Sequence, residues 1–167
     1  MVKATRNHEA WLLIGGNMGH RLQNLTKAST LIEHYCGRII RASSIYETDA
    51  WGKTDQPRFL NQALQVETAL EPSSLLSQIL AIEKEMGRSR IEKYGPRLID
   101  IDILFFDDDI IDLPSLEIPH PRMQDRRFVL VPLAEIAGGK VHPALQKTVS
   151  GLLHDCIDPL QVSLYDY

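Results

Sequence analysis

The sequence is poor in cysteine. Its 167 residues include only two, Cys36 and Cys156, which lie far apart and match neither a C-x-x-C pattern nor the spacing of a zinc site. This pattern favours two reduced structural thiols over a disulfide pair or a metal centre. We therefore expect the protein to work in a reducing compartment, with the cytoplasm as the default.

The sequence also lacks long hydrophobic runs and an excess of positive charge. The apolar stretch Ala10–Ile14 is too short for the core of a signal peptide and far too short to cross a membrane. The formal net charge of −4 argues against a general nucleic-acid or membrane-surface binder, because such proteins carry broad basic surfaces. We expect neither kind of partner, although a local basic cluster is compatible with this charge.

The remaining composition is typical of one globular domain. Hydrophobic residues make up 44% of the chain and charged residues 24%. A chain of this length can bury a core without disulfides or metals to stabilise it. Turn residues occur throughout, but no repeat, low-complexity tract or linker divides the sequence. We therefore expect residues 1–167 to form a single domain.

Hydrophobic spacing and turn residues predict an order of strands and helices. The expected elements are a strand at 10–14, a helix at 22–35 closed by Gly37, a strand at 38–46, a long loop at 47–58, a strand at 59–68, a helix that starts at 71–74 and is closed by Gly87, a basic loop at 88–96 and a strand at 98–106. This order predicts a ferredoxin-like βαββαβ core, which is an α+β fold. Its antiparallel sheet would have the helices on one face and be followed by a C-terminal extension.

The last of these strands carries two acidic residues in an apolar setting. Side chains alternate across a strand, so Asp100 and Asp102 are expected on one face and the isoleucines between them on the other. Two neighbouring carboxylates repel each other and need a cation, and Mg²⁺ prefers one or two carboxylates together with substrate phosphates. The alternative is a solvated edge strand with two ordinary aspartates.

A basic segment precedes the acidic strand. Arg88, Arg90, Lys93 and Arg97 place four cations within ten residues, and arginine suits phosphate oxygens because it binds them in a bidentate way. Alone, such a segment is commonly a solvated loop. Beside the carboxylate pair, it predicts a metal–triphosphate substrate, with the carboxylates on the metal and the cations on the phosphates.

A third motif lies in the proline-rich segment 118–127. Prolines on both sides of His120 restrict the backbone there and would hold the imidazole for a ligand, while Arg122, Arg126 and Arg127 add cations. The alternative is a surface loop. In contrast, Gly15–Gly19 lacks the pattern of a phosphate-binding P-loop, and we interpret it as a tight turn between strand and helix.

Together these motifs resemble the 6-hydroxymethyl-7,8-dihydropterin pyrophosphokinase family of folate biosynthesis. The resemblance covers residues 10 to 155 in the family's order, and its matching stretches are 14–19, 44–48, 55–61, 95–102, 118–122 and 126–128. It implies a small monomeric enzyme that transfers diphosphate from Mg-ATP to the hydroxymethyl group of the pterin, giving AMP and the pterin diphosphate. It also implies two Mg²⁺ ions.

The resemblance assigns roles to individual residues. Those assigned to catalysis are Arg88, Arg90, Arg97, Asp100 and Asp102, of which the two aspartates are the metal ligands. Those assigned to ATP binding are Glu83, Arg88, Arg97, His120, Arg122 and Arg126. Those assigned to the pterin are Thr48, Phe59, Asn61 and Phe128, because aromatic rings can stack on the heterocycle and an amide can bind its edge. No residue is singled out as the general base.

Two other functions are compatible with parts of the pattern. A ferredoxin-like small-molecule sensor would share the fold but would need no carboxylate pair beside a basic segment. A metal-dependent phosphohydrolase could use Asp100 and Asp102, but it would usually need further histidine or carboxylate ligands near by, and few can be placed.

Overall fold

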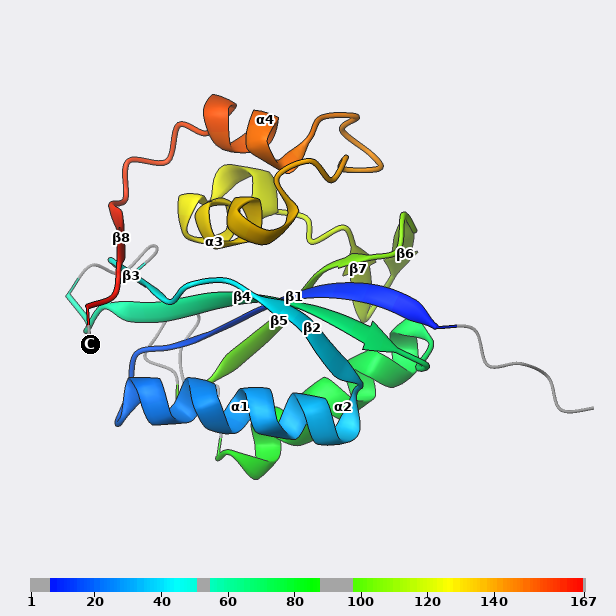
Figure 1. Ribbon diagram of the computed structural model, residues 1–167, viewed down its shortest axis with the longest axis horizontal. Helices are drawn as coiled ribbons and strands as arrows, with labels where there is room; N and C mark the ends of the chain where they lie inside the picture. The colour runs from blue at the N-terminus through cyan, green and yellow to red at the C-terminus, as the bar shows by residue number, and fades with distance from the viewer. Residues whose placement is uncertain (1–6, 51–54, 88–97, 167) are drawn as a thin grey trace, which may run out of the picture.

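The computed structural model describes residues 7–50, 55–87 and 98–166 (Figure 1). Its main elements are β1 (His8–Gly16), α1 (Arg21–Tyr35), β2 (Arg38–Ala42), β3 (Tyr46–Thr48), β4 (Phe59–Thr68), α2 (Pro72–Glu85), β5 (Asp100–Phe106), β6 (Ile111–Leu113), β7 (Leu116–Ile118), a short 3-10 helix (Met123–Asp125), α3 (Arg127–Ala137), α4 (Val149–Asp155) and β8 (Val162–Leu164). The predicted α+β fold, with its strand–helix–strand–strand–helix–strand core, is confirmed.

In the described part of the chain, the core is one antiparallel sheet of six strands. Its order is β5-β1-β4-β3-β8, and β2 pairs with the other end of β4. Strand β1 therefore lies between β4 and β5, and almost all of its residues are buried. Strands β6 and β7 form a separate hairpin.

Helices cover both faces of this sheet. Helices α1 and α2 lie on one face, as expected for the core, whereas α3 and α4 from the C-terminal extension cover the other (Figure 1). The alternation along β1 reflects these two layers, because Leu12 and Ile14 pack in the cluster with α1 and α2, whereas Trp11 and Leu13 pack with α3 and α4. Burial on both faces explains why β1 is a continuous apolar run.

Some boundaries differ from the expected ones. Strand β1 begins two residues earlier and runs through Gly15 and Gly16, which were interpreted as a turn. The strand expected at 38–46 is divided into β2 and β3 at Ser43, whose hydroxyl accepts a hydrogen bond from the Ala63 N–H at 2.9 Å. A side chain thus takes the place of a backbone acceptor, which interrupts the ladder. The short strand β8 was not expected.

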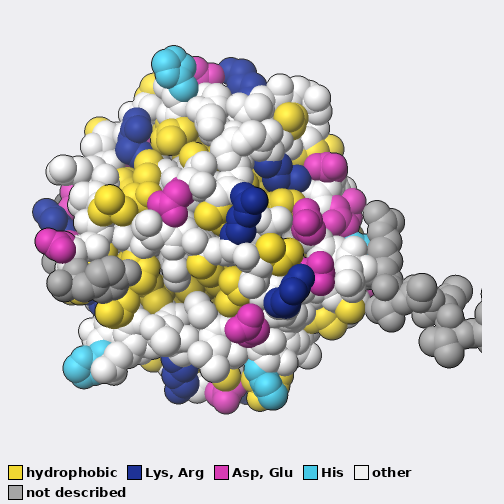
Figure 2. Space-filling view, viewed as in Figure 1, with side chains coloured by type: hydrophobic (Ala, Val, Ile, Leu, Met, Phe, Trp, Pro, Cys, Tyr) yellow, Lys and Arg dark blue, Asp and Glu magenta, His cyan; other side chains and the backbone are white. Residues whose placement is uncertain are grey.

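Charges of both signs are interspersed on the face of the molecule seen in Figure 2. None of the described helices has the length and apolar content needed to span a bilayer.

Gly37 provides a test of the turn that follows α1. Its φ of +154° disfavours other residues, and a Cβ added there would lie 2.1 Å from the Glu67 carbonyl oxygen on β4. We expect Gly37→Ala to lower the free energy of unfolding by roughly 2–4 kcal/mol, because backbone must move. The matched control is Gly139→Ala, whose added Cβ would meet no atom within 4 Å. Urea denaturation measures both variants, and equal stabilities would contradict the proposed strain.

Candidate active site

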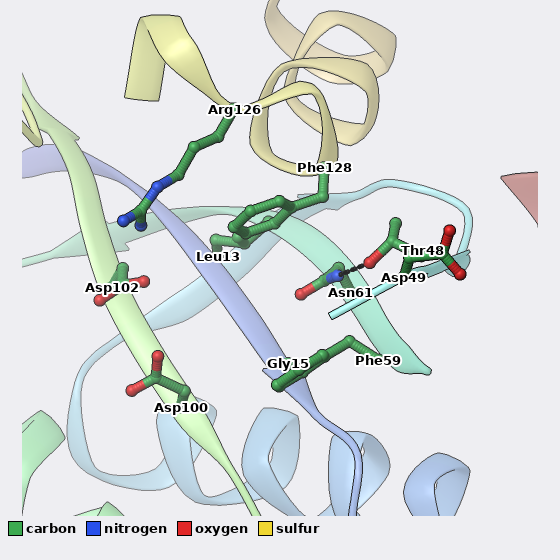
Figure 3. Close-up of a pocket in the computed structure, with 10 residues that line it drawn as sticks. All are labelled: Leu13, Gly15, Thr48, Asp49, Phe59, Asn61, Asp100, Asp102, Arg126 and Phe128. Carbon is green, nitrogen blue, oxygen red and sulfur yellow. Dashed lines mark hydrogen bonds between the residues drawn. The ribbon is translucent and has the colours of Figure 1, made fainter. Parts of the chain in front are cut away.

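One pocket opens between the sheet and the beginning of α3 (Figure 3). Strands β1, β3, β4 and β5 supply its floor and walls, and α3 with the residue before it supplies the remaining side. The residues that line it are Leu13, Gly15, Thr48, Asp49, Phe59, Asn61, Asp100, Asp102, Arg126 and Phe128. Seven of the site residues predicted from the sequence therefore meet here, although they come from four separate segments of the chain.

The two aspartates lie at one end of this pocket. Asp100 pairs with Gly15 and Asp102 with Leu13 in the β1–β5 ladder, and both carboxylates face the pocket (Figure 3). Ile101, between them, points into the core on the opposite face. The alternation expected from the sequence therefore places both carboxylates on the pocket side of β5.

The outer edge of β5 is covered from α2. Glu83 is buried, and its Oε2 accepts a hydrogen bond from the Ile101 N–H at 2.9 Å. Because β5 is an edge strand, this N–H would otherwise need water. Glu83 thus holds the residue between the two aspartates. It does not line the pocket, and its predicted contact with ATP stays a prediction.

The opposite end of the pocket is built around a buried amide. Asn61 donates a hydrogen bond from Nδ2 to Thr48 Oγ1 at 3.1 Å, and both side chains are almost fully buried. Gly15 is the ladder partner of Asn61, and a Cβ at Gly15 would lie 2.2 Å from Asn61 Oδ1. Only glycine leaves room for the amide across β1. Gly15 thus lets the Asn61 side chain approach the backbone of β1 closely. The sequence-based interpretation of Gly15 as a turn residue missed this role.

Aromatic rings flank this end from two sides. Phe59 is the first residue of β4, and Phe128 lies in the first turn of α3 (Figure 3). Arg126 precedes α3 and extends toward Asp102, with its Cζ 5.8 Å from the centre of the Phe128 ring. The pocket therefore joins an aromatic end to a charged end.

Helix α3 is held over the sheet by Glu135. Its Oε1 accepts a hydrogen bond from the Tyr46 hydroxyl and its Oε2 accepts one from the Ser44 N–H, both at 2.6 Å. Burial, the hydrogen bond to Glu135 and the charge of that residue raise the pKa of Tyr46 to about 12. Burial by itself would raise the pKa of the Glu135 carboxyl. The hydrogen bonds from Tyr46 and Ser44 outweigh burial, so the pKa of Glu135 lies below its ordinary value. The pair therefore stays in one protonation state near neutral pH.

His120 lies close to the charged end without lining the pocket. Its Nδ1 accepts a hydrogen bond from the Arg122 N–H at 3.2 Å, which leaves the ring proton of a neutral imidazole on Nε2. Burial lowers the pKa of His120 to about 4, with Arg126 and Arg122 adding to the effect and Asp100 opposing it. The imidazole is thus a neutral hydrogen-bond donor at pH 7. The side chain of Arg122 is exposed.

Three predicted site residues lie outside the described part of the chain. They are Arg88, Arg90 and Arg97, and the roles expected for them stay predictions. In contrast, Leu13 and Asp49 line the pocket without having been predicted. Leu13 was indistinguishable from a core residue in an apolar strand. Asp49 follows Thr48 directly and pairs with Arg58, with 3.2 Å between Oδ1 and Nε.

The donor set at the charged end fits Mg²⁺ better than zinc. Among the residues that the structure describes, no group of three or more His, Cys, Asp and Glu side chains could hold a metal by itself. Two half-buried carboxylates on one strand face match the preference of Mg²⁺ for one or two protein oxygens, with substrate phosphates and water completing its shell.

Comparison with known proteins gives a consistent family assignment. The family model for 7,8-dihydro-6-hydroxymethylpterin-pyrophosphokinase matches residues 11–138. The 2-amino-4-hydroxy-6-hydroxymethyldihydropteridine pyrophosphokinase of Bacillus subtilis is 45% identical over 131 residues, which cover 78% of each chain. The protein of that name from Synechocystis is 43% identical over 152 residues, covering 89% of this chain and 77% of its relative.

Solved structures agree on the fold. The wild-type HPPK-DHPS protein of Plasmodium falciparum superposes with a TM-score of 0.74 at 21% identity, and the match covers 92% of this chain. This chain spans 45% of that longer protein. Because the two sequences are only 21% identical, the likeness concerns the fold alone.

The family match confirms the predicted pyrophosphokinase and decides against the sensor and the phosphohydrolase. The chain belongs to the 7,8-dihydro-6-hydroxymethylpterin-pyrophosphokinase family, and it is a pyrophosphokinase of folate biosynthesis that acts on a pterin with Mg-ATP.

Proposed function

We propose that the pocket binds the pterin at its aromatic end and the ATP phosphates at its charged end. The observation that carries this proposal is the continuity of the pocket, in which Phe59, Asn61 and Phe128 lie at one end and Asp100 and Asp102 at the other. A flat heterocycle fits between two aromatic rings, and a polyphosphate needs cations and a metal. In this arrangement the two reacting groups would lie beside each other.

At the aromatic end, the pterin ring stacks against Phe128 and contacts Phe59 from the other side. The edge of the pterin carries donors and acceptors, which match the amide of Asn61. Because Thr48 accepts from Nδ2, the amide has a fixed orientation that leaves Oδ1 toward Gly15 and the pocket. A fixed orientation favours a ring with a donor at the matching position over one without it.

At the charged end, Arg126 contacts the phosphates and neutral His120 donates a hydrogen bond to the nucleotide from Nε2. Exposed Arg122 would contact solvent-facing phosphate oxygens. The roles proposed for Arg88, Arg90, Arg97 and Glu83 rest on the sequence pattern and on the family resemblance. Their cationic members would neutralise charge that develops as diphosphate moves.

Asp100 and Asp102 would hold two Mg²⁺ ions against the phosphates. When bound, such ions neutralise phosphate charge and orient the attacking and leaving oxygens. The support for this role is the donor set, which consists of two carboxylates on one face and needs substrate oxygens to complete a coordination shell.

The reaction proceeds within this arrangement by displacement at the β-phosphorus. The hydroxymethyl oxygen of the pterin forms a bond to that phosphorus, and the bond from the β-phosphorus to the α–β bridging oxygen breaks. AMP leaves with the electron pair, and the hydroxyl proton is lost. The contribution of the protein is to align the two substrates and to stabilise charge, because phosphoryl chemistry demands little else.

We also propose that residues 1–167 act as one domain, as a monomer and in the cytoplasm. One sheet with a packed layer on each face supports the single domain. Sedimentation equilibrium at micromolar concentration should give the mass of one chain, and a mass of two chains would contradict the monomer.

The carboxylate pair is tested by amide substitution. Asp100→Asn and Asp102→Asn should each lower turnover by about 100-fold or more, because each removes a charged ligand of the metal. The measurement is the formation of AMP from ATP, dependent on both pterin and Mg²⁺. Asp109→Asn, at an exposed position in the turn after the same strand, is the control and should retain normal turnover. Near-normal rates in both test variants, or ADP as the product, would contradict the proposed role.

The aromatic end is tested at Phe128. Phe128→Ala should weaken pterin binding by about tenfold, because stacking of a heterocycle on an aromatic ring contributes about 1–3 kcal/mol. Binding of an ATP analogue should change by less than about twofold. Leu153→Ala removes another partly buried side chain from the same apolar cluster and should leave the pterin dissociation constant unchanged. Equal losses for both ligands in Phe128→Ala would argue against stacking.

A further inference from the structure

The wall of the pocket that carries Thr48 and Phe59 lies beyond the end of the central strand. The last pair in the β1–β4 ladder is Gly16 with Leu60, so Phe59 has its ladder partner only in β3, where it pairs with Thr48. At this end, among the described strands, Phe59 of β4 has a neighbour on one side only, whereas Thr48 lies between Phe59 and Val162 of β8. Because β1 ends before Phe59, the start of β4 lacks a ladder partner on the β1 side, and side chains must supply contacts there.

Arg21 supplies such contacts from the first residue of α1. Its Nη1 donates to Glu47 Oε2 at 2.6 Å and to the carbonyl oxygen of Arg58 at 2.9 Å. Glu47 precedes Thr48 in β3, and Arg58 precedes Phe59 at the start of β4. One guanidinium thus joins both strands at the residues next to the pocket. The Arg21 and Glu47 side chains are each only about one quarter exposed, which limits screening of the ion pair by water.

Asn17 makes a parallel contact from the connection between β1 and α1. It is buried, and its Nδ2 donates to Gln56 Oε1 and to the carbonyl oxygen of Pro57, both at 2.9 Å. The carbonyls of two consecutive residues, 57 and 58, are therefore both held by side chains, one from this connection and one from the start of α1. The backbone that enters β4 at Phe59 is therefore held by side chains at the β1–α1 connection and at the start of α1.

Arg21 also contacts the C-terminal segment. Its Cζ lies 5.7 Å from the centre of the Tyr165 ring, and the Tyr165 N–H donates to the Ile45 carbonyl at 2.9 Å. This segment follows β8, which pairs with β3. The guanidinium is thus enclosed by β3, the start of β4 and the residue after β8, and its planar fork suits several acceptors at once in a way that lysine does not.

We propose that Arg21 is a positioning residue of the pyrophosphokinase reaction, which holds Phe59 and Thr48 in place for the pterin through the Arg58 carbonyl and the Glu47 carboxylate. The proposal rests on the pterin role proposed above for this wall. Its consequence is selective: loss of Arg21 loosens the pterin end, whereas the carboxylate pair on β5 stays in register with β1.

The experiment compares the pterin KM, measured at saturating Mg-ATP, with kcat and with the dissociation constant of an ATP analogue. Arg21→Met keeps much of the side-chain volume and removes the donors. It should raise the pterin KM by about tenfold or more, because small displacements of a binding wall are costly. The other two quantities should stay within about twofold of their wild-type values.

Two further variants make this result specific. Arg21→Lys keeps the charge but not the fork, so it should give a smaller rise in the pterin KM than Arg21→Met. Arg38→Met removes a mostly exposed arginine whose Nη2 lies 3.8 Å from Glu67, and it should leave all three quantities unchanged. An unchanged pterin KM in Arg21→Met, or equal losses for pterin and ATP, overturns the proposal. Should Arg21→Met fail to fold, Arg21→Lys carries the same test with the same overturning outcomes.

Phe59→Ala separates this proposal from the one on which it rests. If Phe59→Ala raises the pterin KM and neither Arg21 variant does, the positioning role is wrong and the proposed pterin wall stands. If Phe59→Ala leaves the pterin KM unchanged, the assignment of this wall to the pterin is itself overturned.

Discussion

The pairing of β1 with a strand on each side is the constraint on which the site depends. In these two ladders Gly15 is the partner of both Asn61 on β4 and Asp100 on β5. The register therefore sets the amide and the first carboxylate on opposite sides of one glycine. A slip of one residue would turn every side chain of a strand to the other face, so burial of β1 on both faces also fixes the site.

The two helical layers make different contributions. Helices α1 and α2 close the larger apolar cluster, and from α2 Glu83 binds the backbone between the two aspartates. Helix α3 closes the second cluster and brings Arg126 and Phe128 over the opposite face of the sheet. Glu135 anchors α3 to the strand that carries Thr48. Helices α3 and α4 thus cover the second face of the sheet, and α3 also completes the pocket.

A diphosphate transfer enzyme needs two substrates of different chemistry side by side. The pocket has an aromatic, amide-bearing end and an acidic end on either side of the central strand, which suits the proposed binding of the two substrates. Phosphoryl transfer depends on alignment and on charge stabilisation more than on covalent catalysis. This is consistent with candidate residues that are carboxylates, guanidiniums, aromatic rings and an amide.

The sequence by itself determined the βαββαβ order of the core, the turn at Gly37 and the alternation that places Asp100 and Asp102 on one face, because these follow from local periodicity and backbone preference. It also carried enough motifs for the family. Only the tertiary structure decided that Gly15 makes room for an amide, that Leu13 and Asp49 line the pocket, and that Ser43 divides one expected strand into two. Each of these depends on a partner from a distant segment, and contacts between distant segments leave no periodic trace in the sequence.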